Sequence, residues 1–137
     1  SFYIPFVSEK TTDLSSINIV STAQSNRNVP VAIDLVFIYK TTLKPMFIPF
    51  GAREWYENKA ALMLRHDEFI DVAHFEVVPF SNMEEVTLPE DCGDAIQVLL
   101  FANFIATDGQ YAADITTFDE LQITLSENGY QLEELDP

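Results

Sequence analysis

Apolar and polar residues alternate with a period of two over most of the chain, which is typical of half-buried β-strands. The clearest run covers residues 31–39, where every second residue is large and apolar; these positions are Val31, Ile33, Leu35, Phe37 and Tyr39. Shorter runs of the same kind predict strands over residues 14–21, 69–78, 83–88, 111–118, 121–125 and 130–132.

Residues 95–106 are almost continuously apolar, which predicts a central strand that is buried on both faces. Asp108-Gly109 is a strong signal for a two-residue hairpin turn, and Asn128-Gly129 predicts a second hairpin. Residues 22–30 are polar and contain two asparagines and a proline, so they predict a solvent-exposed loop between the first two strands.

One segment, residues 51–66, has the period of a helix instead. Its apolar face is formed by Ala52, Trp55, Tyr56, Ala60, Leu62 and Met63. Its polar face is formed by Glu54, Glu57, Asn58, Lys59 and Arg65. About eight strands and one helix predict a mainly β fold, an antiparallel β-sandwich with the helix inserted at one edge or end. We expect an irregular lead-in over residues 1–13, one sandwich domain over 14–132, and an acidic tail over 133–137.

Composition limits the possible functions. The chain has 137 residues, which suits one domain, and a net charge of −15. Residues 1–65 hold seven basic and five acidic residues (+2), whereas residues 66–137 hold seventeen acidic residues and no Lys or Arg (−17). Because phosphate contacts need a basic footprint, no nucleic-acid partner is expected. The acidic half either keeps the protein soluble or steers a basic partner.

Candidate catalytic chemistry is sparse. The chain holds two histidines, His66 at the end of the predicted helix and His74 within a predicted strand, and we interpret both as structural. Cys92 lies in an acidic turn, whose charges disfavour the thiolate that a nucleophile needs. A single cysteine also excludes an internal disulfide and a cysteine-based zinc site. We therefore expect a protein without catalytic residues, metal ligands or a cofactor.

Two other functions stay open from the residues alone. The acidic loops could bind calcium or carbohydrate in an extracytoplasmic β-sandwich, although no EF-hand spacing is present. A carboxylate pair could serve a small glycoside hydrolase, although only one Trp is present to line a cleft. The remaining reading is a module that binds another protein through its loops, an exposed sheet edge or the helix.

The order of elements resembles the type VI secretion outer-membrane lipoprotein family. The resemblance rests on SINIVSTAQSNRNVPVAIDLVFIYK (residues 16–40), in which a strand, a polar loop and Pro-Val precede an alternating strand that ends in Tyr39. A segment with phenylalanine and a helix follows over residues 47–66, then a strand that leads to Pro79, then the apolar VLLFANF of residues 98–104. The similarity covers residues 16–125.

The resemblance implies a transthyretin-like β-sandwich in the periplasm, held at the inner leaflet of the outer membrane by a lipidated cysteine. That anchor is absent from this chain, and no other membrane contact is expected. The resemblance further implies binding to the periplasmic domain of an inner-membrane secretion protein through the loop after the first strand. Here that loop corresponds to Ala23, Gln24, Ser25, Asn26, Arg27, Asn28 and Val29.

Overall fold

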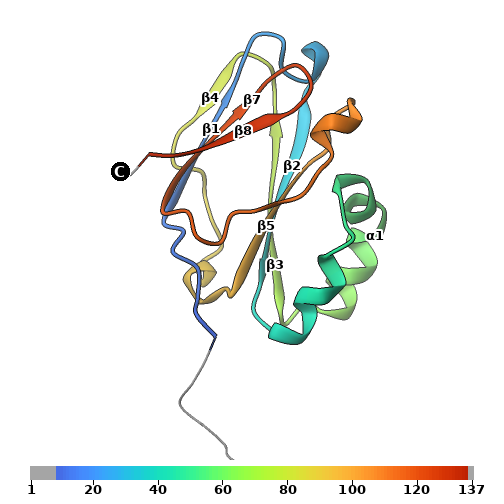
Figure 1. The fold of residues 1–137 in the computed structure, drawn as a ribbon, viewed down its shortest axis with the longest axis vertical. Coiled ribbons are helices and arrows are strands. Elements are labelled where there is room, and N and C mark those ends of the chain that lie inside the picture. Colours follow the sequence, from blue (N-terminus) through green and yellow to red (C-terminus); the bar gives the residue numbers. More distant parts are fainter. Residues whose placement is uncertain (1–8, 136–137) are drawn as a thin grey trace, which may run out of the picture.

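The computed structural model describes residues 9–135 and contains two packed four-stranded β-sheets with one helix outside them (Figure 1). The first sheet has the order β4-β1-β7-β8 and consists of β1 (Ser16–Ser21), β4 (Ser81–Met83), β7 (Glu120–Leu125) and β8 (Tyr130–Glu134). The second has the order β3-β2-β5-β6 and consists of β2 (Val31–Ile38), β3 (Ile70–Val77), β5 (Gln97–Ala102) and β6 (Ala113–Asp114). The predicted mainly β sandwich is confirmed. One pair is parallel, because β1 and β7 run in the same direction over six residues.

Strand β2 lies at the centre of the molecule and is buried on both faces. Ile33, Leu35 and Phe37 point into the core between the two sheets. Val36 and Ile38 point to the opposite face, where they join a second apolar cluster. The period-two pattern of this strand therefore separates two cores, rather than a core and a solvated surface.

Helix α1 (Ala52–Arg65) covers the outer face of the β3-β2-β5-β6 sheet (Figure 1). It begins after Gly51, whose N–H donates to Glu54 Oε1 at 2.8 Å, and ends at His66. Trp55 and Leu62 are buried against the sheet. The expected position at an edge or end is wrong, because the apolar outer face of β2 and β5 needs a cover.

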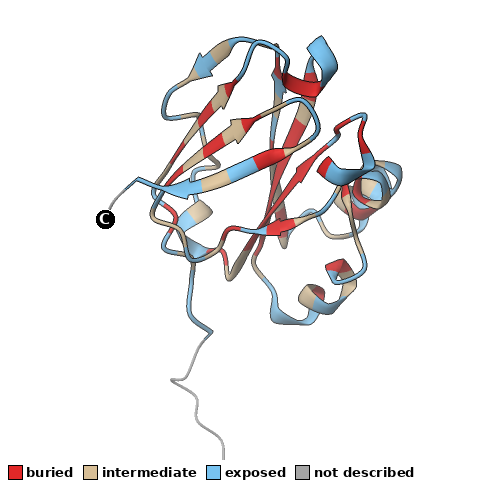
Figure 2. Ribbon diagram, turned by 45° about the horizontal axis from the view of Figure 1, so that its top comes forward, coloured by how far each residue is buried: buried red, intermediate tan, exposed pale blue. Residues whose placement is uncertain are grey.

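Most of the expected apolar face of the helix packs on the sheet, but two residues are placed differently. Ala60, predicted on the apolar face, is exposed. Lys59, predicted on the polar face, is turned inward toward Asp34. Figure 2 shows the resulting burial, which is greatest in the central strands, while most connections and β8 beyond Tyr130 are exposed or intermediate.

Three predicted elements are wrong. The strand expected over residues 83–88 is not formed, because β4 ends at Met83 and the backbone of Glu85 has a positive φ. The strand expected over 111–118 is reduced to β6, because Asp114 Oδ1 accepts from the Thr116 N–H and turns the chain. Asp108-Gly109 lies in a 3₁₀ turn within the ten-residue connection 103–112. The expected two-residue hairpin is therefore wrong, because ten residues separate β5 from β6.

The second hairpin is confirmed, because β7 and β8 are antiparallel and residues 126–129 join them. Strand β8 extends to Glu134, so part of the predicted acidic tail belongs to the sheet. Residues 1–8 of the expected lead-in and 136–137 of the tail lie outside the described residues. Over residues 9–135, the structure has no helix long and apolar enough to cross a bilayer.

Candidate functional site

The loop between β1 and β2 lies at one end of the sandwich. The β3–β4 connection and the β7–β8 turn lie at the same end (Figure 1). Backbone hydrogen bonds link them: Asn26 N–H donates to Ser126 O at 3.0 Å, and Phe80 N–H donates to Thr22 O at 3.0 Å. The predicted partner loop is therefore the centre of a group of connected loops.

The loop has an unusual backbone. It contains a short 3₁₀ segment, Ser25–Asn28, in which Asn26, Arg27 and Asn28 have φ values of 51°, 55° and 67°. Left-handed backbone costs a side-chain-bearing residue roughly 1 kcal/mol or more, although asparagine tolerates it best. Three such residues in succession are held in place only when the surrounding structure determines them, and such strain is concentrated at functional sites.

Asn26 holds this strained conformation. Its Nδ2 donates to Pro30 O at 3.1 Å, and its Oδ1 accepts from Ile105 N–H at 2.8 Å, on the β5–β6 connection. Asn26 and Ser25 are buried. These two predicted site residues therefore shape the loop rather than present themselves to a partner.

The other five predicted site residues are exposed: Ala23, Gln24, Arg27, Asn28 and Val29. Four of them, all but Val29, line an open hollow of about 460 Å³ together with Glu127. Arg27 Nε donates to Asn128 Oδ1 at 3.3 Å, so its guanidinium is oriented by the β7–β8 turn. The structure thus offers a rigid loop with an exposed cation at its tip.

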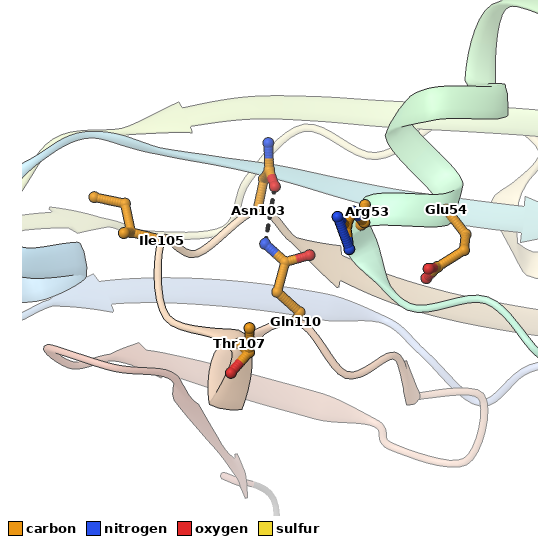
Figure 3. Close-up of a pocket in the computed structure, with 6 residues that line it drawn as sticks. All are labelled: Arg53, Glu54, Asn103, Ile105, Thr107 and Gln110. Carbon is orange, nitrogen blue, oxygen red and sulfur yellow. Dashed lines mark hydrogen bonds between the residues drawn. The ribbon is translucent and has the colours of Figure 1, made fainter.

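A second hollow of about 470 Å³ lies between the start of α1 and the β5–β6 connection (Figure 3). It is lined by Arg53, Glu54, Asn103, Ile105, Thr107 and Gln110. Gln110 Nε2 donates to Asn103 Oδ1 at 3.0 Å, and Gln110 O accepts from Ala52 N–H at 2.7 Å. Gln110 therefore joins the β5–β6 connection to the helix.

Sequence reasoning missed a charged cluster between α1 and the sheet. Asp34, in the middle of β2, has no exposed surface. Its carboxylate accepts from Trp55 Nε1 at 2.8 Å and lies 2.9 Å from Lys59 Nζ. His74 Nδ1 contacts the same carboxylate, and His74 Nε2 lies 2.9 Å from Glu76 Oε2. The cluster fastens the helix to the sheet.

The charges of this cluster also shift the pKa of a neighbouring tyrosine. Burial raises the pKa of Tyr56, and the negative charges of Asp34 and Glu76 raise it further. The only feature of the sequence that pointed to this charged cluster was an aspartate, Asp34, inside an apolar strand. Asp34 is buried and paired only because α1 covers that face of the sheet.

The residues considered for nucleophilic or metal chemistry do not converge in the described structure. Cys92 lies in a 3₁₀ turn, and its thiol pKa is raised, first by burial and then by Asp91 and Asp94. His66 ends α1, whereas His74 belongs to the Asp34 cluster. Within residues 9–135, no three His, Cys, Asp or Glu side chains are placed to hold a metal ion.

These features define a two-sheet β-sandwich with a helix on one outer face and its most constrained loop at one end. The same fold occurs in components of type VI secretion systems. The T6SS lipoprotein TssJ1 from Pseudomonas aeruginosa matches with a TM-score of 0.64 and 16% identity, over 88% of this chain and 95% of that chain. Lip from Serratia marcescens, a membrane-bound component of the system, matches with a TM-score of 0.57 and 12% identity, over 86% and 94%.

A chain of a type VI membrane complex matches with a TM-score of 0.62 and 12% identity, over 91% of this chain and 99% of that chain. No protein-family model and no curated protein matches the sequence. The chain therefore has the fold of the type VI secretion lipoproteins, and the resemblance expected from the sequence is confirmed at the level of the fold.

Proposed function

We propose that this protein is a non-enzymatic interaction module of a type VI secretion membrane complex. The observation that carries the proposal is the shared fold, which extends over nearly the whole of both chains in the comparison with TssJ1. The Serratia relative of this fold is a membrane-bound component of the system. By analogy, this chain acts in the periplasm, and a lipid anchor holds it at the inner leaflet of the outer membrane.

The partner in this proposal is the periplasmic domain of an inner-membrane secretion protein. The β1–β2 loop is the contact, through Ala23, Gln24, Arg27, Asn28 and Val29. Its support is physical: the loop is strained, its conformation is fixed by Asn26, and Arg27 is exposed. A loop fixed before binding loses little conformational entropy when the complex forms.

This proposal is tested by a binding measurement. The full 137-residue chain is mixed with the periplasmic domain of the inner-membrane protein from the same secretion system. Calorimetry or interferometry should detect the complex with the unaltered chain. Arg27→Glu should weaken it at least tenfold, because it reverses the charge at the loop tip. Since residue 27 is exposed and Glu has a similar left-handed cost to Arg, the fold should be retained.

Arg65→Glu is the matched control, because Arg65 is also exposed but lies at the end of α1. It should bind as the unaltered chain does. No binding by the unaltered chain would refute the proposed function. Equal binding by Arg27→Glu and the unaltered chain would refute the assignment to this loop.

A further inference from the structure

Phe80 combines two unfavourable features. It lies in the connection between β3 and β4, where its φ is 58°, and its side chain is 82% exposed. A bulky residue with a left-handed backbone is a genuine conformational outlier. The exposed ring gains none of the apolar burial that usually compensates for such strain.

The position of Phe80 is fixed by the base of the β1–β2 loop. Its N–H donates to Thr22 O at 3.0 Å. The adjacent Ser81 N–H donates to Ser21 Oγ at 2.9 Å, and Ser21 Oγ donates to Val78 O at 2.6 Å. The backbone on both sides is therefore tied down, and the ring is held out into solvent.

Two other exposed apolar residues belong to the segments that meet at this end of the sandwich. Val78 directly follows β3 and lies two residues before Phe80, and Val29 precedes β2, whose Val31 pairs with Val77 of β3. Val29 and Val78 are both exposed. An aromatic ring that is held in solvent is a common anchor of protein–protein contacts.

We propose that Phe80 is an aromatic anchor that inserts into an apolar socket on the same partner protein that the β1–β2 loop binds. This inference rests on the proposed function and extends its contact surface to the β3–β4 connection. Glycine would adopt this backbone without strain, so the presence of Phe is explained by a contact outside this chain. An aromatic ring that becomes buried in a partner's pocket commonly contributes a large share of the binding free energy of an interface.

Charge favours a protein socket over the other possible occupants. With a net charge of −15, the chain is repelled by an anionic lipid surface. Two copies of the chain repel each other for the same reason. A partner protein that carries an apolar pocket and no large excess of negative charge meets neither obstacle.

The test compares Phe80→Ala and Phe80→Gly with Leu64→Ala, in the full chain, against the same periplasmic domain. Leu64 is the matched control, because its side chain is 85% exposed on the outer surface of α1. Both Phe80 variants should bind at least tenfold more weakly, and Leu64→Ala should bind normally. Phe80→Gly should unfold at the same temperature as the unaltered chain or a higher one, because glycine relieves the strain.

Phe80 variants that bind normally, while Arg27→Glu binds weakly, would overturn the anchor and leave the proposed function standing. No binding by the unaltered chain would overturn both. Two measurements test the other possible occupants. Flotation with phosphatidylethanolamine–phosphatidylglycerol vesicles tests binding to a lipid surface, and sedimentation equilibrium tests dimer formation. Vesicle binding or dimer formation that is lost in Phe80→Ala would overturn the proposal in favour of a lipid surface or a second copy.

Discussion

Replacing Lys59 with methionine removes the cation that faces the buried carboxylate of Asp34. Methionine keeps most of the length and the apolar stem of lysine, so the change acts mainly on charge. Asp34 has no exposed surface, whereas the Lys59 side chain is 26% exposed. The variant therefore leaves a buried negative charge that has lost its lysine, although Trp55 and His74 still contact it.

The size of the effect follows from this geometry. Two unit charges 2.9 Å apart attract by roughly 6 kcal/mol at an effective dielectric constant of about 20. Much of this attraction is offset by desolvation, and removing one partner of a buried pair typically costs about 3–5 kcal/mol. Because Trp55 still donates to Asp34 and Lys59 is partly solvated, we expect a loss of about 3 kcal/mol in the free energy of unfolding.

Urea denaturation measures this loss, and Trp55 is the chain's single tryptophan, so its fluorescence reports on the site itself. The midpoint should fall while the slope of the transition stays constant. Lys10→Met is the matched control, because Lys10 pairs with Asp13 at an exposed site, and it should unfold like the unaltered chain. Asp34→Asn should cost only about 1–2 kcal/mol, since it removes the buried charge and frees Lys59 to reach water.

The double variant Asp34→Asn/Lys59→Met completes a double-mutant cycle, which measures the interaction energy between the two side chains. If the two side chains interact, its loss of stability should be smaller than the sum of the single losses by at least about 1 kcal/mol. Additive losses, or a Lys59→Met chain within about 0.5 kcal/mol of the unaltered chain, would refute the view that this pair fastens α1 to the sheet.

Three further outcomes follow from the structure. Gly109→Ala should lower the free energy of unfolding, measured by urea denaturation, by about 1–3 kcal/mol, because its Cβ would lie 2.6 Å from the Phe104 ring. Gly93→Ala is the control and should leave this free energy unchanged, because its Cβ would meet nothing within 4 Å. The raised pKa of Cys92 should make its reaction with Ellman's reagent at pH 8 slow in the folded chain and faster in urea, and equal rates would contradict this. Burial raises the pKa of Tyr39, Tyr56 and Tyr130, so the contribution of these groups to stability is complete below about pH 10 and falls above it. Of the absorbance of the chain's five tyrosines at 295 nm, the part that belongs to these three should rise together with unfolding, and a rise of that part before unfolding would contradict this.

Local patterns were sufficient for the central elements of the fold. The alternation in β2, the apolar run of β5 and the helical period of α1 each predict an element that the structure contains. The β7–β8 turn was also readable, because Asn128-Gly129 has strong turn chemistry. These features depend on neighbours within a few residues, so a single sequence reveals them.

The features that were missed depend on contacts between distant segments. The parallel pairing of β1 with β7 joins residues about 100 positions apart and leaves no local mark. Lys59 was assigned to solvent because its charge, taken alone, favours exposure, yet Asp34 on another element holds it inward. The left-handed backbone of Phe80 is set by a hydrogen bond to Thr22, which its own neighbours in the sequence do not indicate.

The placement of β1 has a mechanical consequence. This strand lies between β4, which is antiparallel to it, and β7, which is parallel to it. A force that pulls on the chain ahead of Ser16 acts along the strand, so the six residue pairs that β1 forms with β7 are loaded together in shear. A force that pulls on the chain after β8 would instead open the β7–β8 hairpin one residue pair at a time. A tether ahead of β1 would therefore load a strand pair whose hydrogen bonds resist the force together.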